Sequence, residues 1–78
     1  MEVKKRKTLV ELAVNEMGKV SRFTDQLLAS RLLAMGILPG SQIQVLGKAP
    51  LNSGIYIKFD NQRVALRYKE AQSIVVSL

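Results

Sequence analysis

The side chains that could do chemistry in this chain are carboxylates, lysines and arginines, because the sequence contains no histidine and no cysteine. Nucleophilic catalysis by a Ser-His-Asp or Cys-His arrangement is therefore impossible within the chain, and imidazole and thiolate metal ligands are absent. The 6 acidic residues are the remaining metal ligands, and no two of them stand three or four positions apart on a predicted helix. We expect no catalytic residue, no metal site and no bound cofactor, and thus a protein that is not an enzyme.

Two arginines occupy positions from which they could act on an anionic group of a partner. Arg31 lies near the edge of a predicted helix and Arg67 near the end of a predicted strand. Either guanidinium could stabilise phosphate charge on a nucleotide bound by another protein, as an arginine finger does. The alternative is that each arginine is solvated or held in an ion pair, which at a surface is common and weak.

The formal net charge of +6 is concentrated near the N-terminus, where 4 of the 12 basic residues form the run Lys4, Lys5, Arg6 and Lys7. We expect residues 1–7 to be a disordered basic tail and residues 8–78 to form a single domain. The tail could approach anionic lipid headgroups, where each charge contributes about 1 kcal/mol. No stretch approaches the roughly 20 apolar residues that cross a bilayer. We therefore expect a soluble, cytoplasmic protein.

A helix is predicted between residues 24 and 36, and it is the element that positions Arg31. Thr24 or Asp25 can cap its N-terminus, and Gly36 can end it in the left-handed conformation. Pro39 prevents the helix from resuming and, with Gly40, predicts a turn. The apolar residues of this helix cover more than one face, whereas a helix packed on one core needs a stripe somewhat over 100° wide. Either the barrel covers all of them, or Leu27 and the helix end near Leu38 belong to a docking patch for another protein.

Alternation of apolar and polar residues predicts strands in the rest of the chain. Thr8 and Glu11 fit a capping box that begins a short helical turn, and Asp60 and Asn61 fit a tight hairpin. Residues 47–54 are predicted to form a loop. The strands are expected around residues 19–23, 43–45, 55–59, 63–67 and 74–76, with a single helical turn at residues 69–71. Five short strands with one inserted helix predict a mainly β fold, a small barrel.

The run Arg-Leu-Leu-Ala-Met-Gly-Ile-Leu-Pro-Gly at residues 31–40 resembles the signature of the ferrous iron transport protein A (FeoA) family. Three other segments agree with the resemblance, at residues 8–12, 48–51 and 65–71, so that it covers about residues 8–76. The resemblance implies a cytosolic SH3-like barrel that accompanies the membrane ferrous iron transporter FeoB, whose cytoplasmic part includes a GTP-binding domain. It also implies an association with transition metal at the level of the family, although this chain offers no ligand set.

From the helix and the resemblance together we expect a partner-binding surface at the helix end and the following loop. The residues predicted to form it are Leu27, Leu28, Arg31, Met35 and Leu38. Gly36, Pro39 and Gly40 are expected to be structural, because glycine and proline act first on the backbone.

Two other functions remain open for a barrel of this kind. The C-terminal domains of metal-dependent repressors of the diphtheria toxin repressor type share it, and a fold alone does not fix function. Small basic barrels also bind nucleic acid, but they combine basic residues with stacking aromatic side chains. Only Tyr56 and Tyr68 are expected to be exposed here, so we expect no nucleic acid as a partner.

Overall fold

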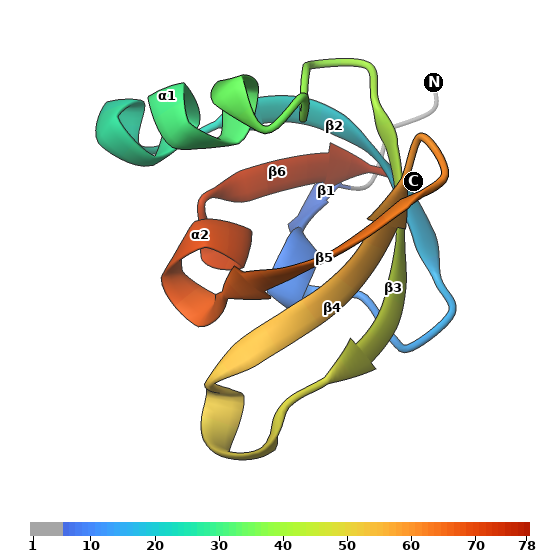
Figure 1. Ribbon diagram of the computed structural model, residues 1–78. Coiled ribbons are helices and arrows are strands. Elements are labelled where there is room, and N and C mark those ends of the chain that lie inside the picture. The colour runs from blue at the N-terminus through green and yellow to red at the C-terminus, as the bar shows by residue number, and fades with distance from the viewer. Residues whose placement is uncertain (1–5) are drawn as a thin grey trace.

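The computed structural model describes residues 6–78, which form one curved antiparallel sheet with two α-helices (Figure 1). The strands are β1 (Arg6–Thr8), β2 (Met17–Phe23), β3 (Gln42–Lys48), β4 (Gly54–Phe59), β5 (Gln62–Arg67) and β6 (Ile74–Ser77). The helices are α1 (Gln26–Ala34) and α2 (Tyr68–Gln72), with the 3-10 turns η1 (Leu9–Glu11) and η2 (Pro50–Asn52). The predicted mainly β fold with one inserted helix and short helical turns is confirmed.

The six strands follow the order β1-β6-β2-β3-β4-β5, and β2 joins the two halves of the sheet. Residues 17–19 of β2 pair with β3, whereas residues 19–23 pair with β6. The register with β6 shifts between Val20 and Arg22, and an irregularity of this kind bends a strand and increases its twist. The bend lets the sheet curl around its core, with β1 and β5 at the two ends of the strand order.

Gly18 allows β2 and β6 to pack closely. A Cβ atom at this position would lie 2.9 Å from the Cβ atom of Val76 and 3.2 Å from the Cδ1 atom of Leu12. The core on which these strands close consists of residues from η1, α1, α2 and all strands except β1. Its fully buried large side chains are Leu9, Leu12, Leu32, Ile37, Ile43, Val45, Ile55, Ile57, Ile74 and Val76.

The folded domain begins earlier than the sequence predicted. Arg6 and Lys7, assigned above to the tail, pair with Ser77 and Val76 as part of β1. The sheet therefore has six strands and not five, because a strand of three residues is too short to produce a visible alternation. The other residues of the predicted tail, 1–5, lie outside the described residues, and their disorder stays a prediction.

The capping box before η1 forms as predicted. The backbone N–H of Thr8 donates to Oε1 of Glu11 at 2.8 Å, and the Thr8 hydroxyl donates to the same oxygen at 3.0 Å. Both hydrogen bonds favour the ionised carboxylate, the backbone bond more strongly, and they hold the pKa of Glu11 below its ordinary value. The capping box positions Leu9 and Leu12, both fully buried, against the core.

The hairpin between β4 and β5 is also confirmed. Asp60 and Asn61 have φ angles of 49° and 62°, and they connect Phe59 to its pairing partner Gln62. Positive φ at both central residues is the geometry of a type I′ turn, which matches the twist of the flanking strands. Asp and Asn are the non-glycine residues that adopt this conformation most readily.

The predicted loop at residues 47–54 is shorter than expected, because β3 continues through Lys48 and β4 begins at Gly54. Leu51, in η2, has a φ angle of 60° and is 99% exposed. Figure 1 shows this connection at the end of the molecule opposite α1.

Candidate partner-binding surface

Helix α1 begins at a side-chain cap. Asp25 has an extended backbone, and its Oδ1 atom accepts a hydrogen bond from the backbone N–H of Leu28 at 3.0 Å. Of the two predicted caps, Asp25 is therefore the one used. This bond satisfies one of the N–H groups that a helix leaves unpaired in its first turn.

The C-terminus of α1 is closed by a Schellman motif around Gly36. Gly36 has a φ angle of 96°, and its N–H donates to the carbonyl of Leu33 at 3.0 Å. The N–H of Ile37 donates to the carbonyl of Leu32 at 3.0 Å, and both of these side chains are fully buried. Hydrogen bonds of this pattern with an apolar contact across them end a helix at a fixed residue, and Gly36 has the positive φ that the motif requires.

A β-turn at residues 38–41 carries the chain from α1 to β3. The N–H of Ser41 donates to the carbonyl of Leu38 at 2.9 Å, and Gly40, at the third position, has a φ angle of 93°. Pro39 at the second position and a glycine with positive φ at the third are typical of a type II turn. The N–H of Gly40 also donates to the carbonyl of Val20 in β2 at 2.8 Å. The predicted turn is confirmed, and it is anchored to the sheet.

The apolar residues of α1 divide sharply between core and solvent. Leu32 is fully buried, whereas Leu27 is 85% exposed and Leu33 is 43% exposed. Leu28 and Met35 lie between these extremes. The barrel therefore does not cover all the apolar residues of the helix, which was one of the two alternatives left open by the sequence.

Four of the five predicted partner-binding residues share one side of α1. At 100° per residue, Leu27 and Arg31 lie about 40° apart around the helix axis. Met35 and Leu28 lie within about 60° of Arg31. Ala34, also exposed, lies beside Leu27 on the same side. We call Leu27, Leu28, Arg31, Ala34 and Met35 the α1 surface. The fifth predicted residue, Leu38, is 50% exposed and belongs to the turn that follows the helix.

Arg31, the one charged residue within α1, is held by an ion pair to α2. Its Nη1 atom lies 3.6 Å from Oε2 of Glu70, and the two side chains are 63% and 9% exposed. The other carboxylate oxygen of Glu70 accepts the backbone N–H of Arg67 at 2.8 Å. Glu70 thus connects the start of α2 to α1. Of the two alternatives for Arg31, the geometry favours the ion pair; sequence reasoning missed its partner, which stands 39 positions away.

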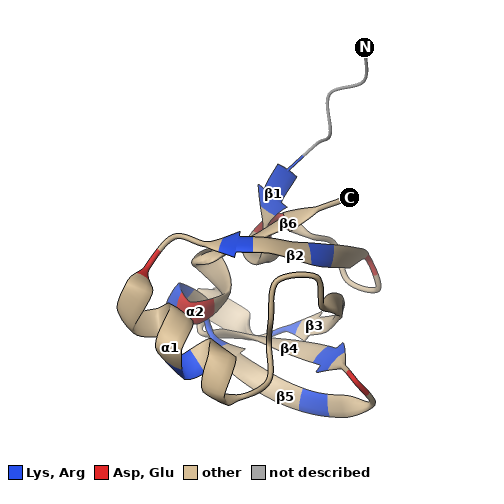
Figure 2. Ribbon diagram, turned by 90° about the horizontal axis from the view of Figure 1, so that it is seen from above, with Lys and Arg blue, Asp and Glu red and all other residues tan. Residues whose placement is uncertain are grey.

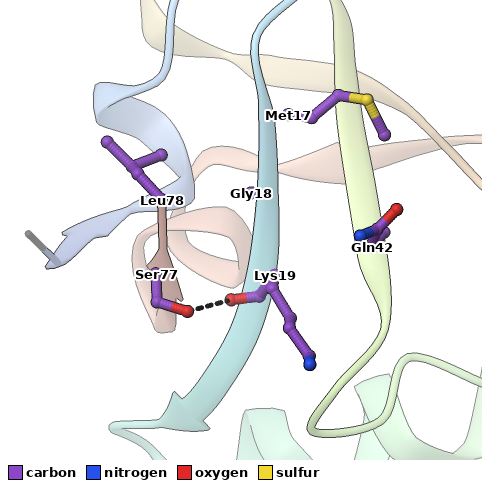
Figure 3. A pocket seen from close by; sticks show the side chains of 6 residues that line it. All are labelled: Met17, Gly18, Lys19, Gln42, Ser77 and Leu78. Carbon is purple, nitrogen blue, oxygen red and sulfur yellow. Dashed lines mark hydrogen bonds between the residues drawn. The ribbon is translucent and has the colours of Figure 1, made fainter. Parts of the chain in front are cut away.

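A groove between the ends of β2, β3 and β6 has a volume of about 350 Å³ (Figure 3). Its polar groups are the Lys19 amine, the Gln42 amide and the Ser77 hydroxyl, which donates to the Lys19 carbonyl at 3.5 Å. The groove is lined by Met17, Gly18, Lys19, Gln42, Ser77 and Leu78. Sequence reasoning did not identify it, since its walls come from three distant segments. None of the side chains that line the groove is a carboxylate.

Within residues 6–78, no three acidic side chains come together in a way that could hold a metal ion. In the same part of the chain, no helix has the length and apolar character that crossing a bilayer requires.

Solved structures provide three informative comparisons. An FeoA-like protein from Clostridium acetobutylicum is 28% identical, with a TM-score of 0.85 over 95% of this chain and 87% of that one. FeoA of Stenotrophomonas maltophilia, solved with zinc and described as an SH3 domain protein, is 28% identical, with a TM-score of 0.77 over 90% and 88%. A manganese-dependent transcriptional repressor is 25% identical, with a TM-score of 0.85 over 99% of this chain but 44% of the repressor. The predicted SH3-like barrel is confirmed by these similarities.

A search of curated proteins by sequence gives no match. The model of the FeoA domain matches residues 7–78, which is nearly the whole chain and includes the helix, the Schellman motif and the turn described above. The expectation drawn from residues 31–40 is therefore confirmed, and the chain belongs to the FeoA family, which is associated with ferrous iron transport.

Proposed function

We propose that this protein is a cytoplasmic accessory protein of ferrous iron uptake that binds an FeoB-type membrane transporter through the α1 surface and catalyses no reaction itself. The observation that carries the proposal is the exposure of Leu27, which is 85% accessible on a helix with defined ends at both termini. A single exposed leucine is ordinary. Here, however, Leu28 and Met35 are partly exposed on the same side of the helix, so Leu27 is not the only apolar side chain that a partner could contact there.

The α1 surface is arranged before any partner arrives. The Asp25 cap and the Schellman motif fix the two ends of the helix, and the ion pair to Glu70 restrains Arg31. A surface that is already ordered loses less conformational entropy on binding, which favours affinity. The complementary site on the partner would be an apolar pocket for Leu27 with an acceptor for the exposed part of the Arg31 guanidinium.

Membership in the FeoA family supports the choice of partner, since the family is associated with ferrous iron transport. In this proposal the protein acts at the inner face of the membrane by contacting the transporter or its GTP-binding domain. The α1 surface provides contact area and takes part in no reaction in this proposal. Arg31 is its only charged residue.

The test is a calorimetric titration against the purified cytoplasmic domain of the cognate transporter, in its different nucleotide states. Leu27→Glu should weaken binding at least about tenfold, which corresponds to about 1.4 kcal/mol. Leu51→Glu is the matched control, because it makes the same change at a leucine that is 99% exposed at the opposite end of the molecule. An equal loss in both variants, or no saturable binding by the unchanged protein in any nucleotide state, would contradict the proposal.

A further inference from the structure

The outer face of β4 and β5 gathers cations around one exposed aromatic ring. Side chains alternate between the two faces of a strand, and the buried residues Ile55, Ile57, Phe59 and Leu66 identify the inner face. The residues between them face outward. We call this outward set the β4–β5 face, and it consists of Tyr56, Lys58, Arg63, Ala65 and Arg67.

Small residues flank Tyr56 on both sides and leave its ring accessible. Tyr56 pairs with Ala65 of β5 and with Gly47 of β3. A Cβ atom built on Gly47 would lie 3.6 Å from Cδ2 of the tyrosine, so that the ring lies over the glycine. Tyr56 is 50% exposed. An apolar or planar group of a partner therefore has room to pack on this ring.

Two of the three cations of this face lie directly opposite each other. Lys58 pairs directly with Arg63 in the register of the two strands, and Arg67 lies two residues beyond Ala65 on the same face. Figure 2 shows the basic stretches of β4 and β5 side by side. Like charges directly opposite each other on neighbouring strands destabilise the pair. A bound anionic group would remove this repulsion.

None of these cations forms an ion pair within the part of the chain that the structure describes. Across residues 6–78 the ion pair between Arg31 and Glu70 is the one found. The β4–β5 face itself contains no acidic residue, and Asp60 of the adjoining hairpin, which lines a hollow together with Lys58, forms no ion pair with it. Its charge is therefore available to a partner, in contrast to the charge of Arg31.

We propose that the β4–β5 face binds an acidic peptide segment of another protein, with carboxylates on Lys58, Arg63 and Arg67 and an apolar side chain on Tyr56. A second copy of this chain would place the same cations against one another, which disfavours self-association here. Single-stranded nucleic acid commonly stacks successive bases on several aromatic side chains, and this face has one. The proposal involves a surface other than α1 and does not depend on the partner proposed there.

The test follows the amide signals of the full-length, isotope-labelled protein by NMR during titration with the peptide Glu-Glu-Phe-Glu-Glu. We expect saturable shift changes centred on Tyr56 and Ala65, and no such changes with Gln-Gln-Phe-Gln-Gln. Arg63→Glu should weaken binding at least about tenfold, whereas Arg63→Lys should retain most of the affinity, because the positive charge is kept. Retained dispersion of the amide signals establishes that each variant is folded.

Arg22→Glu is the matched control, because it makes the same charge change at an exposed arginine of β2, beside Val75 of β6. It should leave the affinity for the peptide within about twofold. An equal loss in Arg22→Glu and Arg63→Glu would overturn the proposal, since binding would then follow net charge alone. Tighter binding of a thymidine oligonucleotide or of phosphatidylglycerol vesicles at the same residues would also overturn it, in favour of nucleic acid or membrane.

Discussion

The α1 surface and the β4–β5 face expose side chains for different physical reasons. Helix α1 has more apolar residues than one core contact can bury, so that Leu32 is enclosed while Leu27 remains in solvent. The strands alternate regularly, so their outward positions are polar, as in any sheet with one solvated face. The one cation of the α1 surface has a buried partner, whereas those of the β4–β5 face have none among the described residues. The comparison shows that one small barrel exposes two surfaces of opposite character, one apolar and one cationic.

The largest expected effect is a loss of stability, and it distinguishes a buried residue on the inner side of α1 from an exposed residue on its outer side. Leu32→Ala should lower the free energy of unfolding by about 2–5 kcal/mol, because it leaves a cavity in a fully buried site. Leu27→Ala should change it by no more than about 0.5 kcal/mol, since this side chain is already in solvent. Urea denaturation of both variants measures the difference. Similar losses in the two variants would mean that Leu27 is part of the core, and the contrast between the surfaces would fail.

The next effect compares how much the two partners of the ion pair, Glu70 and Arg31, each contribute to the free energy of unfolding. Glu70→Ala should cost about 1.5–3 kcal/mol, because it removes a nearly buried acceptor from the backbone N–H of Arg67 as well as the partner of Arg31. Arg31→Ala should cost about 0–1 kcal/mol, since its guanidinium is largely exposed. Thermal denaturation provides the measurement. A larger loss for Arg31→Ala would show that this arginine is mainly a structural residue of α1, which would weaken its place in a binding surface.

The smallest effect concerns Glu11, which belongs to neither surface. Hydrogen bonds from Thr8 hold the pKa of Glu11 below its ordinary value in the folded protein. The carboxylate of Glu11 therefore contributes its full stabilisation above the pKa that a glutamate has in the unfolded chain, about 4.3. This stabilisation is lost as the pH falls through the lower pKa that Glu11 has in the folded protein. Unfolding measured between pH 6 and pH 3 should show a shallower decline for Glu11→Gln than for the unchanged protein. Parallel curves would contradict this assignment.

Local signals predicted much of the fold and of α1. The Asp25 cap, the glycine that ends the helix and the Asp60–Asn61 hairpin each depend on residues within a few positions of one another, where side-chain chemistry fixes the backbone. The resemblance of residues 31–40 to the FeoA signature also predicted the family of the chain. The role of the α1 surface in binding stays a prediction.

Features that depend on distant pairing could not be predicted in the same way. Strand β1 has three residues and is defined by its partner β6. The contact between Arg31 and Glu70 requires the packing of α1 beside α2. In both cases the determining interaction joins segments whose relative position no local pattern specifies. The register that places Lys58 opposite Arg63 differs from these, because it follows from the predicted Asp60–Asn61 hairpin.

The most direct test of the account is one titration series against the cytoplasmic domain of the cognate FeoB-type transporter. The unchanged protein, Leu27→Glu and Arg63→Glu would be compared at about 50 mM and 500 mM salt, which bracket strong and weak screening between exposed charges. If the α1 surface is the docking site, Leu27→Glu loses affinity at both salt concentrations, while the unchanged protein and Arg63→Glu bind alike and depend little on salt. Binding that survives Leu27→Glu but collapses in Arg63→Glu or at high salt would contradict the account and assign the transporter to the β4–β5 face.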